Sequence, residues 1–189
     1  MALAQYTKRS PPFELIVLAP HNATLNGSTL DACHEGAAIE GFCRGPQITS
    51  TPSYGSSFYF NTSTSNSNSK ASDVQGVLSY DLVIADNTTV PSSMYLVDTW
   101  TSNVAVPILS PGYDPVTEVY FDAQDFMYIL STQDDTVSPA GQKQEKVKQW
   151  YVCTTYYGYT YDTLAWTVGK RAKPQNPTCQ KVEVKRVWV

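Results

Sequence analysis

The residues best suited to chemistry in this sequence lie at 150–166, WYVCTTYYGYTYDTLAW, where Tyr and Trp crowd together. Aromatic rings of this kind stack on the flat faces of sugar rings, and an aromatic-rich strand pair would present several of them. The candidates for such a ligand-binding surface are Trp150, Tyr156, Tyr159 and Tyr161. Tyr is also enriched in β-strands in general, because it packs well on a half-buried pleated surface. Core packing is therefore the simpler interpretation for most of these residues, and those that remain exposed at the surface are the ones that could bind a ligand.

The two-residue period of a β-strand divides the start of this stretch into two faces. One face carries Tyr151, Cys153, Thr155 and Tyr157, and the other carries Trp150, Val152, Thr154 and Tyr156. A disulfide at Cys153 would turn its own face inward. We therefore expect Trp150 and Val152 to point to a second layer or to solvent.

Acidic residues are the next candidates for chemistry, and they gather at Asp114, Glu118, Asp122, Asp125, Asp134 and Asp135. A glycosidase needs two carboxyl groups at a set separation across a sugar cleft. The sequence does not show which carboxyl groups face each other, but Asp122 and Asp125 resemble turn residues and Asp134-Asp135 a solvated loop, so a glycosidase pair is the weaker interpretation. The sequence contains no Gly-x-Ser-x-Gly motif. We expect no enzymatic activity and no catalytic residue.

Four cysteines, an even number, fit two disulfides with three pairings open. Separations of ten and twenty-six residues favour Cys33 with Cys43 and Cys153 with Cys179. A metal site is the rival interpretation, but the sequence has no Cys-x-x-Cys, and its two histidines, His21 and His34, lack ligand spacing. Disulfides are favoured, and we expect no metal and no other cofactor.

Four Asn-x-Ser/Thr sequons are candidate glycosylation sites and point to the secretory pathway: Asn22, Asn26, Asn61 and Asn87. Only 16% of the residues are charged, so the surface must be hydrated mainly through hydroxyl and amide groups, as is common in extracellular proteins. A net charge of −4 argues against nucleic acid as a partner. No run approaches the ~20 apolar residues of a membrane span. We expect a secreted, extracellular protein.

These candidate residues must be positioned by strands, because short apolar runs separated by turn residues recur along the chain. Residues 13–18 (FELIVL) are the clearest strand, residues 61–72 read as an exposed polar loop, and only 141–148 (GQKQEKVK) suits a short helix or a long loop. We predict an all-β fold with two disulfides, either a single-domain antiparallel β-sandwich or a closed β-barrel with long polar loops. This domain would span residues 12–189, after an N-terminal tail at 1–11 with a candidate dibasic processing site at Lys8-Arg9.

Three segments of the sequence support a wider resemblance. The segments FELIVLAPHNATLNGSTLDACHEGAAIEGFC and WYVCTTYYGYTYDTLAWTVG, with PQNPTCQKVEVKRV near the end, resemble a family of small secreted fungal proteins of uncharacterised function. The likeness runs from Phe13 onward over nearly the whole chain. It implies a secreted fungal protein and transfers no active-site residue.

Assembly is a further hypothesis, because short strands with open edges and few charges favour strand addition between subunits. The segment concerned is 5–18, with candidate assembly residues Tyr6, Phe13, Leu15 and Val17. The sequence thus predicts a secreted structural or interaction protein of the fungal exterior that self-assembles in the cell wall, matrix or fibres. The alternatives are a lectin-like module that binds cell-wall glycan and a secreted effector.

Overall fold

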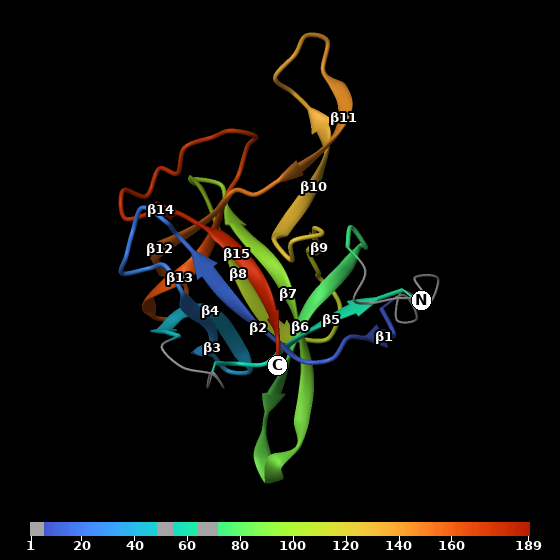
Figure 1. The fold of residues 1–189 in the computed structure, drawn as a ribbon, viewed down its shortest axis with the longest axis vertical. Helices are drawn as coiled ribbons and strands as arrows, with labels where there is room; N and C mark the ends of the chain where they lie inside the picture. The colour runs from blue at the N-terminus through green and yellow to red at the C-terminus, as the bar shows by residue number, and fades with distance from the viewer. Residues whose placement is uncertain (1–5, 49–54, 64–71) are drawn as a thin grey trace.

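The computed structural model describes residues 6–48, 55–63 and 72–189 and is all-β, as the sequence predicts (Figure 1). Within these residues the one helical element is a short 3-10 turn, η1 (Ala85–Asn87). The strands are β1 (Lys8–Arg9), β2 (Phe13–Leu18), β3 (Ser28–Gly36), β4 (Ile39–Gln47), β5 (Phe58–Thr62), β6 (Gly76–Val83), β7 (Thr89–Thr99), β8 (Ser102–Pro111), β9 (Glu118–Phe121), β10 (Met127–Asp134), β11 (Gly141–Val147), β12 (Trp150–Tyr156), β13 (Thr160–Thr167), β14 (Gln180–Lys181) and β15 (Glu183–Trp188). Gln5, where the expected assembly segment begins, and most of the expected polar loop lie outside the described residues.

Eight strands close into an antiparallel barrel in the order β2-β3-β4-β13-β8-β7-β6-β5. The ring closes where Phe13 of β2 pairs with Phe58 of β5. Between β4 and β8 the strand β13 is only partly inserted, because Gly41 of β4 also pairs directly with Ile108 of β8. The prediction of an all-β fold is confirmed, and of its two alternatives the structure is the closed barrel.

The main core is built from large apolar side chains that alternate along the strands. Its fully buried members include Phe13, Leu15, Leu30, Phe42, Phe58, Phe60, Leu78, Met94, Trp150 and Leu164. Each such side chain stabilises the fold by roughly 1.5–3 kcal/mol relative to its exposed state. The core therefore fixes the strands from which every surface feature projects.

Strand β2 is central, which corrects the assembly prediction. One edge of β2 pairs with β15 along its whole length, from Leu18↔Glu183 to Phe13↔Trp188. It also pairs with β5 at Phe13 and with β3 at Leu15 and Ile16. Phe13, Leu15 and Val17 are completely buried. The prediction that these three residues serve assembly is wrong, because their side chains are buried in the core and β2 is already paired with β15, β3 and β5.

The described part of the expected tail is tied into the sheet. Lys8 and Arg9 form β1, which pairs with Thr62 and Asn61 of β5. The Arg9 guanidinium lies 2.7 Å from a carboxylate oxygen of Asp81 and 3.4 Å from the centre of the Tyr59 ring. Ahead of it, the hydroxyl of Tyr6 donates a hydrogen bond to Glu118, so that Tyr6 anchors the segment within its own subunit.

Two hairpins extend from the barrel in opposite directions: the β6–β7 hairpin at the bottom of Figure 1 and the β10–β11 hairpin at the top. The segment expected to be a short helix or a loop is in fact strand β11, paired with β10 from Val147↔Ile129 to Gly141↔Asp134. Its residues are mostly exposed, so neither face requires apolar side chains. Its sequence is therefore mostly polar and lacks the alternation of apolar and polar residues that usually indicates a strand.

Both disulfides join the partners that their separations favoured, Cys33 with Cys43 and Cys153 with Cys179. The first links β3 to β4. The second ties β12 to the segment that follows β13, which thereby folds back over the outside of the barrel. The open choice among three pairings is settled. No helix in the described ranges is long and apolar enough to cross a lipid bilayer.

Candidate functional site

The aromatic stretch forms the β12–β13 hairpin, whose two strands pair from Trp150↔Trp166 to Tyr156↔Thr160. Trp150, Val152 and Leu164 lie on the face that enters the main core. The Trp150 indole is fully buried and donates a hydrogen bond of 2.9 Å to the carbonyl oxygen of Met127. The prediction that Trp150 binds a ligand at the surface is therefore wrong. Its ring is instead part of the main core inside the barrel.

Cys153 lies on the opposite face of the hairpin, outside the main core. It packs with Val104, Ala165 and Cys179 in a small second cluster. The sequence predicts that Cys153 faces inward and that Trp150 and Val152 point to a second layer or to solvent. The structure has the reverse, because Trp150 and Val152 are in the main core and Cys153 is not. The reason is that the loop carrying Cys179 covers the outer face locally, so that a buried disulfide does not identify the inside of the barrel.

The tip of the hairpin, residues 156–161, is held by Glu35. One carboxylate oxygen of Glu35 accepts hydrogen bonds from the backbone N–H groups of Gly158 (3.1 Å) and Tyr159 (2.9 Å). Glu35 is only 2% exposed. A Cβ atom at Gly158 would lie 1.9 Å from the backbone oxygen of Glu35, so this close approach requires glycine. The sequence carries no motif that singles out Glu35.

The exposed aromatic residues of the tip divide between two faces. Tyr156 is 75% exposed, and its register opposite Thr160 places it on the other face from Tyr161, which pairs with Thr155. The Tyr159 ring lies 6.0 Å from Tyr161 and 5.5 Å from His34. The four predicted ligand-binding residues therefore do not form one surface, and His34 lies against the Tyr159 ring.

A groove of about 250 Å³ runs between the β7–β8 hairpin and the end of β12. Three valines form its apolar part, and the other lining residues carry hydroxyl, amide or phenol groups. The lining comprises Val97, Thr99, Ser102, Val104, Val106, Thr154, Thr155, Tyr156, Tyr157 and Asn176. No charged residue is among them. This composition suits a neutral ligand with both apolar and hydroxyl-bearing surfaces.

Several groove residues are held in place by hydrogen bonds. The side-chain amide of Asn176 donates to the carbonyl oxygen of Thr154 (2.9 Å), and the hydroxyls of Thr155 and Thr163 share a bond of 2.6 Å. Burial, a hydrogen bond to Tyr95 and the nearby charge of Glu35 raise the pKa of Tyr157. Tyr157 therefore stays a neutral phenol, and the groove stays uncharged.

Trp100 lies next in sequence to a lining residue of this groove, Thr99, and was not among the predicted ligand-binding residues. It begins the two-residue turn between Thr99 and Ser102, both of which line the groove. Its side chain is fully exposed, which is unusual for the largest apolar residue. The signal available in the sequence was a single Trp in the polar run DTWTSN, where no neighbouring apolar residue predicts burial.

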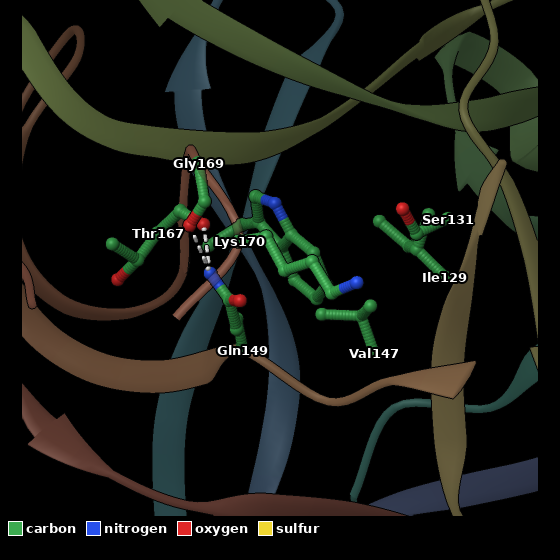
Figure 2. A pocket seen from close by; sticks show the side chains of 8 residues that line it. Ile129, Ser131, Val147, Gln149, Thr167, Gly169 and Lys170 are labelled. Carbon is green, nitrogen blue, oxygen red and sulfur yellow. Dashed lines mark hydrogen bonds between the residues drawn. The ribbon is translucent and has the colours of Figure 1, made fainter. Parts of the chain in front are cut away.

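A second cavity, of about 200 Å³, lies between the base of the β10–β11 hairpin and the segment after β13 (Figure 2). Figure 2 shows Gln149 bonded to the carbonyl oxygens of Thr167 (2.7 Å) and Gly169 (2.9 Å). The amine of Lys170 lies 2.7 Å from a carboxylate oxygen of Glu145 and 3.5 Å from one of Asp134. Hydrogen bonding to Glu145 raises the pKa of Lys170. The charges here satisfy one another, and the cavity offers none to a ligand.

Two of the acidic residues considered for chemistry, Asp122 and Asp125, have structural partners. One oxygen of Asp122 accepts hydrogen bonds from the backbone N–H groups of Gln124 (3.0 Å) and Phe126 (2.9 Å) and thus forms the turn before β10. Asp125 accepts two bonds from the buried guanidinium of Arg186, at 3.0 and 2.7 Å. In the described part of the chain, no three His, Cys, Asp or Glu residues are grouped so as to hold a metal ion.

The chain belongs to a family described as "Domain of unknown function (DUF7907)", which matches residues 10–188. The match begins directly after Arg9, so it covers the complete barrel but not β1. No curated protein and no solved structure matches the chain. The expectation of an uncharacterised family that spans nearly the whole chain is thus confirmed.

Proposed function

We propose that this protein is a secreted, non-enzymatic protein of the fungal exterior that binds neutral cell-wall glycan in the groove between the β7–β8 hairpin and β12. The observation that carries the proposal is the uncharged lining, in which the exposed ring of Tyr156 lies among hydroxyl and amide groups. The exposed Trp100 lies in the turn between two lining residues, Thr99 and Ser102. The two disulfides support an oxidising, extracellular location. Fungal origin rests on the sequence resemblance.

The chemistry of the groove matches a sugar chain in three respects. Pyranose rings have apolar C–H faces that stack on aromatic rings, and Tyr156 offers such a ring at 75% exposure. Sugar hydroxyls are neutral donors and acceptors, and so are Thr99, Ser102 and Asn176. A charged ligand would lose its hydration without gaining a counter-charge in the groove.

Self-assembly through the N-terminal strand is less well supported than glycan binding. Strand β2 is paired with β15 along one edge and with β3 and β5 besides, and its apolar side chains are inside the barrel. Light scattering on the purified protein addresses this alternative directly. We expect a monomer, whereas large ordered particles would favour the structural role.

The decisive experiment is titration calorimetry with soluble fragments of β-glucan, chitin and mannan against the wild-type protein and two variants. Tyr156→Ala removes an exposed ring that lines the groove, and Tyr161→Ala removes a ring on the opposite face of the same hairpin. We expect Tyr156→Ala to weaken binding at least tenfold, about 1.4 kcal/mol, and Tyr161→Ala to bind as the wild type does. Absence of binding to all three glycans, or equal losses in the two variants, would refute the assignment of the groove.

A further inference from the structure

The four sequons occupy very different places in the fold. Asn61 lies in β5, is 3% exposed, and donates a hydrogen bond of 2.8 Å from its amide nitrogen to the hydroxyl of Tyr113. A glycan attaches at that same nitrogen. Because the site has no path to solvent, a glycan at Asn61 is incompatible with the folded barrel.

Asn22 and Asn26 both serve the turn between β2 and β3. The side-chain oxygen of Asn22 accepts hydrogen bonds from the backbone N–H (3.0 Å) and the hydroxyl (2.6 Å) of Thr24. That of Asn26 accepts one from the backbone N–H of Ala19 (2.9 Å). These hydrogen bonds stabilise the turn, and they account for the presence of Asn at both positions without a glycan.

Among the described residues, the Asn87 side chain makes no hydrogen bond of this kind to its turn. Asn87 ends the η1 turn at the tip of the β6–β7 hairpin, which projects away from the barrel (Figure 1). Asn87, Thr88 and Thr89 are all exposed. Asn87 has a φ of 56°, in the left-handed region that Asn tolerates better than most residues, so its side chain stands on a sharp, solvent-facing turn.

The same hairpin tip carries exposed apolar surface. Val83 is 58% and Ile84 44% exposed, and Val83 pairs with Thr89 of the sequon. Two adjacent apolar side chains at the end of a projecting hairpin favour contact between molecules. A bulky hydrophilic group on Asn87 would lie beside them and oppose that contact.

We propose that Asn87 carries an N-linked glycan, which covers the apolar tip at Val83 and Ile84, and that Asn61 remains unmodified. The donor is a lipid-linked oligosaccharide diphosphate. The Nδ2 atom of Asn87 forms a bond to C1 of the first sugar and gives up a proton, while the C1–O bond to the diphosphate breaks and the lipid diphosphate leaves with the electron pair. The proposal rests on secretion and does not depend on what the groove binds.

The test is to express the chain behind a cleavable leader in a eukaryotic host and to release its glycans enzymatically in ¹⁸O-labelled water. Each formerly glycosylated Asn becomes ¹⁸O-labelled Asp, which peptide mass spectrometry locates. We expect label at Asn87 and none at Asn61. Unlabelled Asn87, or labelled Asn61 in the folded and secreted protein, overturns the proposal.

A matched pair of variants isolates the site. Thr89→Ala destroys the sequon but keeps Asn87, and Thr88→Ala changes the neighbouring residue but keeps the sequon. We expect the intact mass to fall by one glycan in Thr89→Ala and to stay at the glycosylated value in Thr88→Ala. An equal glycan mass in both variants contradicts the assignment, and the site mapping on wild-type protein decides the matter should either variant fail to be secreted.

Discussion

At the base of the β12–β13 hairpin, the rings of Trp150 and Trp166 meet edge to face at 4.7 Å, and Trp150 is sealed inside the barrel. At its tip, residues 156–161, the same kind of side chain faces solvent, and the backbone is held by the carboxylate of Glu35. The base depends on packing, and the tip depends on polar contacts from another hairpin. Whether an aromatic residue of this hairpin serves folding or is available for binding therefore depends on whether other parts of the chain cover it.

This difference has an energetic meaning. A buried indole gives up water contact over a large apolar area, so its contribution to folding is several kcal/mol. The exposed tyrosines contribute little to folding because they remain hydrated, and that leaves their rings available to a ligand. Stability should therefore respond most strongly to substitution of the buried rings at the base, and glycan binding to substitution of Tyr156 and the other groove residues.

The largest expected effect is at the base. Trp150→Ala leaves a cavity among Val152, Leu164 and Met127 and also removes the hydrogen bond to the Met127 carbonyl. We expect the free energy of unfolding to fall by about 3–5 kcal/mol, measured by urea denaturation. A loss below about 1 kcal/mol would mean that the ring is not part of the core, since surface substitutions cost no more than that.

The two disulfides should differ in a way that follows from their loops. Loop-closure entropy predicts ~2.7 kcal/mol for the ten-residue loop of Cys33–Cys43 and ~3.5 kcal/mol for the twenty-six-residue loop of Cys153–Cys179. Replacing each pair by Ser and comparing urea midpoints measures both losses. We expect only the second replacement to weaken glycan binding, because Asn176 in that loop lines the groove. If replacing Cys33 and Cys43 weakened glycan binding and replacing Cys153 and Cys179 did not, the loop that carries Asn176 would not be part of the binding site.

A smaller effect is expected where Glu35 supports the tip. Gly158→Ala would place a Cβ atom 1.9 Å from the backbone oxygen of Glu35, so the tip must move away. We expect a loss of about 1–3 kcal/mol in stability, as for overpacking elsewhere. Gly141→Ala is the matched control, because a Cβ there meets no atom within 4 Å. Similar losses in both variants would show that the contact with Glu35 does not hold the tip.

The fold class was predictable from the sequence because apolar runs between turn residues persist over the whole chain. Disulfide pairing was predictable because short separations are simple to close. Which face of β12 points into the barrel was not predictable, because residues 150–153 are apolar or aromatic on both faces. The loop at Cys179 that covers the outer face comes from a later segment of the chain. Strand β11 was hidden for the opposite reason, because a projecting hairpin imposes no apolar pattern.

The candidate site was the least predictable part. Of the four aromatic residues predicted to bind a ligand, Tyr156 alone lines the groove. Their division between the two faces depends on the exact register of β12 and β13. Glu35 and Asn176 act through backbone contacts 123 and 22 residues away in sequence, and no local pattern reports such contacts. Trp100 was missed because one aromatic residue in a polar turn gives no periodic signal.

Trp100 offers the sharpest test of the comparison between base and tip, because it is the same residue type as Trp150 with the opposite surroundings. The Trp100 side chain is fully exposed in the turn between Thr99 and Ser102, so Trp100→Ala removes almost no buried surface. We expect the free energy of unfolding to change by less than about 0.5 kcal/mol. Glycan affinity should fall about three- to tenfold, by loss of one stacking ring worth about 0.5–1.5 kcal/mol. A variant that binds glycan as tightly as the wild type would exclude the β7–β8 turn from the site, and a variant that unfolds more easily would show that Trp100 is covered in solution.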